Sequence, residues 1–107
     1  MTSVNDSEDI FTEAPQVFTL SQNAPNPFNP STAIGFSLFR AADVRLAVYD
    51  ALGREVAVLA EGSYPAGDHT VRWDGRDHRG IKVSSGVYLY RLTAGGKAEI
   101  RRMALVR

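Results

Sequence analysis

The chain has 107 residues, no cysteine, and 12 basic against 12 acidic side chains, so its formal net charge is zero. This length allows a single domain with one hydrophobic core. The neutral balance argues against broad nucleic-acid binding, for which a basic surface is expected. The missing cysteines exclude disulfides, thiolate metal ligands and cysteine nucleophiles.

The charges are distributed unevenly along the sequence. Residues 1–39 contain four acids and no base, residues 40–87 contain seven of each, and residues 88–107 contain five bases and one acid. We expect the polar and acidic residues 1–16 to form a flexible linker and residues 17–107 to form the folded domain. No stretch is apolar enough for a membrane span, and the first residues do not match a signal peptide. The chain is therefore expected to be cytoplasmic or part of a longer protein whose signal lies elsewhere.

A segment rich in proline and asparagine opens the domain. Residues 21–31 have the sequence SQNAPNPFNPS. Because proline pushes the preceding residue toward extended geometry and asparagine favours turns, this segment is predicted to be an ordered loop without ladder pairing. Phe28, in the middle of the loop, is expected to anchor it in the core.

Short segments in which apolar residues alternate with polar ones follow this loop. The predicted strands are, in chain order, residues 34–38, the two arms of a hairpin at 44–59, then 69–73, 87–93 and 97–106. Glycine and aspartate mark the expected turns and loops between them at 50–53, 66–68, 74–80 and 95–96.

The last predicted strand, residues 97–106, changes phase. Ile100 does not share the parity of Met103 and Leu105, so a bulge is expected near residues 101–102. No segment keeps a helical apolar period, and the short strands separated by turns predict an all-β fold. We expect an immunoglobulin-like antiparallel β-sandwich of about seven strands. A small barrel is the alternative, and no internal repeat is visible.

Few residues suit catalysis or metal binding. The only histidines are His69 and His78, and without helices there is no serine at a strand-to-helix elbow, so no catalytic triad is expected. Asp74, Asp77 and His78 offer oxygen and nitrogen ligands in one loop. A turn closed by aspartate hydrogen bonds is the favoured interpretation of this loop, with calcium binding as the alternative. No catalytic residue, cofactor site or metal site is predicted.

Aromatic residues are the remaining candidates for a binding surface. Trp73 has inward parity and is predicted to lie in the core, whereas Tyr49 shares the outward parity of Arg45 and Ala47. Tyr49 is therefore the better surface candidate among the aromatic residues that could form a carbohydrate-binding platform, which are Tyr49, Tyr64, Trp73, Tyr88 and Tyr90.

Four segments occur in a fixed order that is typical of one family. They are LSQNAPNPFNPSTAIGFSL, VRLAVYDALGREVAVL, PAGDHTVRWDGRDHRG and SSGVYLYRLTAGG, followed by RRMALVR at residues 101–107. In this order they resemble the type A C-terminal sorting domain of the type IX secretion system, which is related to the Ig-like domain of flagellar hook-capping proteins. The resemblance covers residues 17–107.

The resemblance implies a non-catalytic sorting and anchoring module placed last in a large exported protein. That protein would pass through the periplasm, be recognised by the outer-membrane translocon, and reach the cell surface or the medium. A sortase-like cysteine peptidase would cleave the linker before Val17 and attach the upstream cargo to lipopolysaccharide. The residues carried over by position as translocon contacts are Pro25, Asn26, Pro27, Gly86, Val87, Tyr88, Arg102, Met103, Ala104, Leu105, Val106 and Arg107.

We also expect the last strand to be an open sheet edge with exposed bases, to which a strand of the receptor adds. A second hypothesis is a passive Ig-like accessory module of a secreted enzyme, which binds carbohydrate or packs on a neighbouring domain. A third is a hook-cap-like assembly domain, which predicts cytoplasmic production of the parent protein and self-association into a ring.

Overall fold

The computed structural model describes residues 17–107, so the predicted acidic linker and the predicted cleavage position lie outside the described residues. Every regular element of the described part is a β-strand, and no helix in it is long and apolar enough to cross a membrane. The strands are β2 (Phe18–Leu20), β3 (Thr32–Leu38), β4 (Ala42–Tyr49), β5 (Glu55–Tyr64), β6 (Gly67–Trp73), β7 (Gly86–Ala94) and β8 (Lys97–Leu105).

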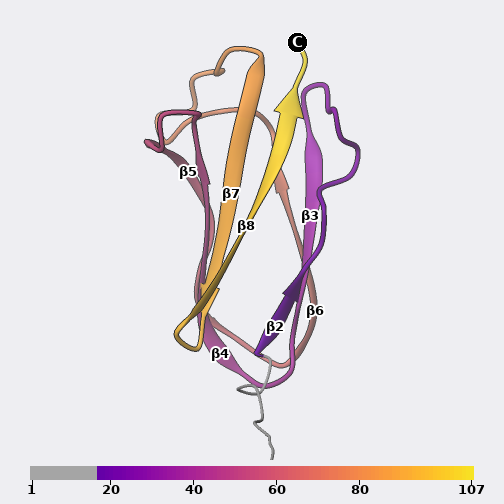
Figure 1. Cartoon of the computed structure of the whole chain (residues 1–107), viewed down its shortest axis with the longest axis vertical. Helices are drawn as coiled ribbons and strands as arrows, with labels where there is room; N and C mark the ends of the chain where they lie inside the picture. Colours follow the sequence, from indigo (N-terminus) through magenta and orange to yellow (C-terminus); the bar gives the residue numbers. More distant parts are fainter. Residues whose placement is uncertain (1–16) are drawn as a thin grey trace, which may run out of the picture.

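The strands form two antiparallel sheets that lie face to face (Figure 1). One sheet has the order β2-β3-β6 and the other the order β5-β4-β7-β8. Two separate sheets confirm the predicted Ig-like sandwich and are inconsistent with the small closed barrel. Each sheet has one face lined by apolar side chains, and these two faces pack together and exclude water.

Large aromatic side chains fill the core at one end of the sandwich. Trp73, at the end of β6, is 2% exposed, which confirms its predicted burial. Its ring centroid lies 5.7 Å from that of Phe28 and 5.3 Å from that of Tyr88. Its indole N–H donates to the carbonyl of Arg76 at 2.9 Å, so the buried polar group of this ring has a partner.

The β4–β5 hairpin is longer than predicted. It spans residues 42–64 rather than 44–59. Its register shifts twice, so that Leu59 and Val56 of β5 have no residue opposite them in β4. Each of these extra residues forms a β-bulge, which bends the strand and increases its twist.

The bulge predicted near residues 101–102 is absent. β7 and β8 keep one register over their whole length. They are joined by the two-residue turn Gly95-Gly96, whose φ angles of 56° and 77° are those that a type I′ turn requires. Ile100 differs in phase from Met103 because it lies on the outer face of the sheet, where it is 57% exposed.

The proline-rich loop, residues 21–31, is ordered as predicted, but it pairs with the last strand. Phe28 is 1% exposed, which confirms that it anchors the loop in the core. Its N–H donates to the carbonyl of Ala104 at 3.0 Å, and its carbonyl accepts from the N–H of Val106 at 2.9 Å. The prediction of a loop without ladder pairing is wrong at Phe28 and also at Ala24, which exchanges two backbone hydrogen bonds of 2.9 Å with Ala33. At Phe28 the reason is that one edge of β8 would otherwise lack partners.

Replacing Phe28 with Ala should destabilise the domain strongly, because it empties a buried site between the sheets. We expect the free energy of unfolding, measured by urea denaturation, to fall by roughly 3–5 kcal/mol. Phe39→Ala is the matched control, since Phe39 is 56% exposed, and it should change this free energy by less than about 0.5 kcal/mol. Equal losses in the two variants would contradict the anchoring role of Phe28.

Candidate functional site

Three segments predicted as contacts are far apart in the sequence but meet at one end of the sandwich. The end of β8 lies between β7 and the loop that precedes β3 (Figure 1). On the β7 side, Val87 is opposite Ala104. On the loop side, Phe28 pairs with β8, and Asn26 Oδ1 accepts a hydrogen bond from the N–H of Ala104 at 3.0 Å. We call residues 25–27, 86–88 and 102–107 together the terminal site.

Several residues of the terminal site are parts of the core and not of the surface. Tyr88, Met103 and Leu105 are at most 6% exposed, so they cannot touch a partner while the domain is folded. Ala104 is half-buried. The exposed members of the terminal site are Pro25, Asn26, Pro27, Gly86, Val87, Arg102, Val106 and Arg107.

The outer edge of β8 is closed at this end of the strand. In a ladder that starts from a two-residue turn, alternate residues direct their backbone groups toward the partner strand or away from it. The carbonyl of Arg102 points away from β7 and accepts from Gln22 Nε2 at 2.7 Å. Both backbone groups of Ala104 are taken up by Asn26 and Phe28. The expected open edge is therefore wrong over residues 102–106, because the proline-rich loop already occupies it.

A buried polar network holds the proline-rich loop in place. Asn23, 3% exposed, donates through Nδ2 to the carbonyl of Pro25 at 3.1 Å and to Thr32 Oγ1 at 3.0 Å. Its backbone N–H donates to the Tyr90 hydroxyl at 2.8 Å, and this hydroxyl donates to the carbonyl of Ser21 at 2.7 Å. Burial raises the pKa of Tyr90, so the hydroxyl keeps the proton that it donates.

Arg107 is tied to the loop between β6 and β7. Its Nε donates to the carbonyl of Val83 at 2.6 Å, and its Nη2 donates to the carbonyl of Gly75 at 2.5 Å. Its backbone N–H donates to Ser85 Oγ at 2.9 Å. Gly75 has a φ of +75°, a backbone conformation that favours glycine, and a Cβ added there would lie 2.7 Å from Arg107 Nη2 and displace the end of this side chain. Arg107 thus fixes the loop beside the terminal site.

Two turns of the domain share one geometry. In each turn, the Oδ1 atom of the aspartate, Asp50 or Asp77, accepts two backbone hydrogen bonds. One comes from the N–H two residues later, at 2.9 Å, and the other from the N–H four residues later, at 3.0 Å. Both turns have the pattern D-x-x-G, at residues 50–53 and 77–80. These backbone hydrogen bonds lower the pKa of both carboxyl groups. The shared turn was missed because a repeat this short is common in loops.

The loop considered for calcium is confirmed as a turn closed by aspartate. Asp77 Oδ1 caps backbone N–H groups, and its Oδ2 faces an arginine two residues later at 3.2 Å. Asp74 also faces an arginine, at 3.5 Å, and His78 Nε2 faces Glu55 at 3.3 Å. Among residues 17–107, no group of three or more histidine or acidic side chains is arranged to hold a metal ion.

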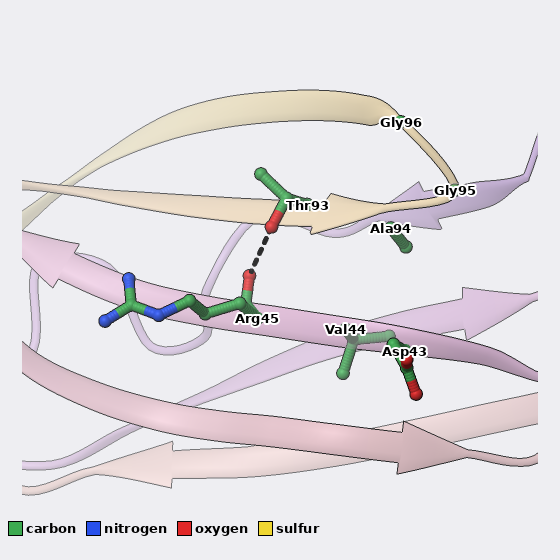
Figure 2. Close-up of a pocket in the computed structure, with 7 residues that line it drawn as sticks. All are labelled: Asp43, Val44, Arg45, Thr93, Ala94, Gly95 and Gly96. Carbon is green, nitrogen blue, oxygen red and sulfur yellow. Dashed lines mark hydrogen bonds between the residues drawn. The ribbon is translucent and has the colours of Figure 1, made fainter.

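Figure 2 shows a shallow pocket beside the β7–β8 turn. This turn lies at the end of the sandwich opposite the terminal site (Figure 1). The volume of the pocket is about 270 Å³. The Thr93 hydroxyl donates to the carbonyl of Arg45 at 3.4 Å, and the Arg45 side chain is held by Glu55 and Glu61. The residues that line it are Asp43, Val44, Arg45, Thr93, Ala94, Gly95 and Gly96. The Thr93 hydroxyl is bonded to the Arg45 carbonyl and the Asp43 carboxylate accepts from Ser63 Oγ at 2.6 Å, so the two are not paired as a nucleophile and its base.

Two of the tyrosines considered for carbohydrate binding, Tyr49 and Tyr64, are packed within the domain. The Arg91 guanidinium lies 5.3 Å from the ring centroid of Tyr49 and donates to its hydroxyl at 3.1 Å. The ring of Tyr64 packs edge-on against His69 and Phe36, with centroid distances of 5.1 and 5.8 Å. Both rings therefore already have partners inside the chain.

Comparison with known proteins identifies a family and a fold. The model of the FlgD Ig-like domain matches residues 21–98. No curated protein matches the sequence of the chain. Among solved structures, the chain is similar to dimeric latent PorU from Porphyromonas gingivalis, with 24% identity and a TM-score of 0.70. This match covers 88% of the chain and 10% of PorU.

Two further structures have the same fold. PorZ from Porphyromonas gingivalis, an essential surface component of the type IX secretion system, has 24% identity and a TM-score of 0.57, covering 80% of the chain and 11% of PorZ. FlgD from Xanthomonas campestris, which acts in hook capping, has 24% identity and a TM-score of 0.57, covering 82% of the chain and 64% of FlgD. At these identities the likenesses establish the fold. The chain spans only about a tenth of PorU and of PorZ.

The stabilisation that the two aspartate turns provide should depend on pH. Because the pKa of both carboxyls is lowered on folding, this stabilisation is present above the unfolded-state pKa of about 3.9 and is lost as the pH falls through the lower folded-state values. We expect the urea midpoint of the unmodified protein to fall more steeply below about pH 4 than that of the Asp50→Asn/Asp77→Asn variant. Asp74→Asn, whose side chain is 63% exposed, is the control and should keep the unmodified pH dependence. Parallel curves for the unmodified protein and the double variant would refute this role.

Proposed function

The chain belongs to the FlgD Ig-like domain family, and we propose that it is a non-catalytic sorting and anchoring module of a larger exported protein. The outer-membrane translocon of the type IX secretion system recognises the folded module on its cargo. A sortase-like cysteine peptidase then removes it. The cargo passes through the periplasm and ends on the cell surface or in the medium.

The convergence of the terminal site is the observation that carries this proposal. Its three segments form one surface only after the chain has folded, because β8 brings residues 25–27 next to residues 86–88. A translocon that binds this surface would select folded modules and reject unfolded ones. The similarity in fold to PorU and to PorZ, a component of the type IX secretion system, supports the assignment to this pathway.

The chemistry of the described residues also favours a binding role over catalysis. Histidine is the commonest general base in catalysis, but both histidines have other partners. His69 Nε2 lies 2.8 Å from the carbonyl of Pro65, and His78 faces Glu55. Within residues 17–107 neither histidine is hydrogen-bonded to a hydroxyl, as the activation of a serine nucleophile requires.

An accessory module that packs against a neighbouring domain is the second candidate function. The observation that favours it is the match to the FlgD Ig-like domain itself, together with the FlgD structure of which the chain covers 64%. In this case the module would contribute to assembly and carry no sorting information.

A reporter fusion distinguishes these two functions. A periplasmic reporter fused in front of the whole 107-residue chain is expressed in a bacterium with type IX secretion and in a matched strain without the translocon. We expect reporter on the surface of the first strain, detected by protease accessibility on intact cells, and retention in the periplasm of the second.

Two features of the structure shape the controls for this fusion. Deleting residues 103–107 is unsuitable, because Met103 and Leu105 are 1% exposed core residues and their loss would unfold the domain. Phe28→Ala serves instead as the destabilised control, and its fusion should reach the surface in smaller amounts than the unmodified one. Retention of the unmodified fusion in both strains would overturn the sorting function and favour the accessory module.

A further inference from the structure

The β7–β8 hairpin has an outer face without carboxylates. Because side chains alternate along each strand, four opposite pairs share this face. Val87 is 46% exposed and Ile100 is 57% exposed, so the face combines cations with exposed apolar side chains. We call it the hairpin face, and its pairs are Val87 with Ala104, Leu89 with Arg102, Arg91 with Ile100, and Thr93 with Ala98.

The two arginines of the hairpin face lack acidic partners. Among the described residues, no carboxylate oxygen lies within 4.0 Å of the side chain of Arg91 or Arg102. The other half of the same sheet is different, because Arg45 pairs with Glu55 at 2.7 Å and with Glu61 at 3.3 Å. The outer surface of this sheet therefore has one half in which charges are paired and one half that is basic.

The position of Arg91 suits it to bind a carboxylate. Its guanidinium lies over the ring of Tyr49 and donates to the hydroxyl of that residue. This contact restricts the side chain before binding, so less conformational entropy is lost when a partner arrives. A guanidinium matches the two oxygens of a carboxylate with two parallel hydrogen bonds. Arg102 extends the same surface to the terminal site.

We propose that the hairpin face is the receptor-binding surface of the module, and that the receptor presents an acidic surface with an apolar centre. The proposal rests on the sorting function proposed above. Carboxylates of the receptor pair with Arg91 and Arg102, while apolar side chains cover Val87 and Ile100 and exclude water from these pairs.

An anionic membrane is the other partner that a basic and apolar surface suggests. Recruitment by anionic lipids typically uses clusters of about 4–8 cations beside a membrane, whereas the hairpin face has two, one of them held by Tyr49. Two separated arginines, each opposite an apolar side chain in the ladder, fit the discrete carboxylates of a protein better than a diffuse lipid surface.

Charge reversal in the reporter fusion tests this proposal. Arg91→Glu with Arg102→Glu should lower the amount of reporter on the surface at least about tenfold, because a receptor carboxylate would then face a carboxylate. Arg40→Glu with Arg72→Glu is the matched control, since both side chains are exposed and lie outside the hairpin face. This control makes the same change in net charge and should leave export unchanged. Both purified variants should still unfold cooperatively on heating, since each pair removes only one exposed side-chain hydrogen bond, from Arg91 to Tyr49 or from Arg72 to Ser31.

Each outcome of this experiment leads to a separate conclusion. Export of the Arg91→Glu/Arg102→Glu fusion at the unmodified level overturns the hairpin face as the receptor surface and leaves the sorting function intact. An equal loss of surface reporter in the Arg40→Glu/Arg72→Glu control also overturns the hairpin face as the receptor surface, because the change in net charge alone would then explain the effect. Failure of the unmodified fusion to reach the surface overturns the sorting function and this proposal with it. Sedimentation of the unmodified protein with vesicles of anionic phospholipid, abolished by the double reversal, assigns the face to lipid instead.

Discussion

The fold depends on the contact between Phe28 and the last strand. A loop with three prolines lacks three backbone N–H groups, and each remaining one that is turned inward needs an acceptor. The N–H groups of Asn23, Ala24 and Phe28 find theirs in the Tyr90 hydroxyl and the carbonyls of Ala33 and Ala104. The side chain of Phe28 packs against Trp73 while its backbone closes the edge of β8. One residue thus seals the core and protects an edge that would otherwise be open to aggregation.

Much of this architecture is predictable from local sequence patterns, because burial on one face of a strand leaves a period of two. The strands β3 to β8, the burial of Phe28 and Trp73, and the turn at residues 77–80 follow from local patterns, whereas the three-residue strand β2 (Phe18–Leu20) was not predicted because it is too short to show a period. The bulges in β5 leave no such trace, because apolar residues lie on both faces of the strand around them. The wrongly predicted bulge near residues 101–102 has a similar cause. Ile100 is apolar but lies on the outer face of the sheet, so the alternation of apolar and polar residues misleads at this position.

The terminal site shows a different limit of sequence analysis. The sequence singles out its three segments but gives no means of separating the core residues in them from the surface residues. The closure of the β8 edge depends on Gln22, Asn26 and Phe28, about 80 residues before their partners, and contacts between such distant positions leave no local pattern. The neutral net charge likewise gives no indication of how charges are placed on the four-stranded sheet. Arg45 forms ion pairs with Glu55 and Glu61, whereas Arg91 and Arg102 have no carboxylate partner among the described residues.

The hydrogen bond between Asn26 and Ala104 joins positions 78 residues apart, and this separation has a consequence for truncated proteins. Without β8, the proline-rich loop has no strand to cover and the core lacks Met103 and Leu105. Phe28 gains its last backbone partner only when Val106 is present. The terminal site therefore exists only where all three of its segments are present and folded, so a cargo that carried a shortened module would lack this surface.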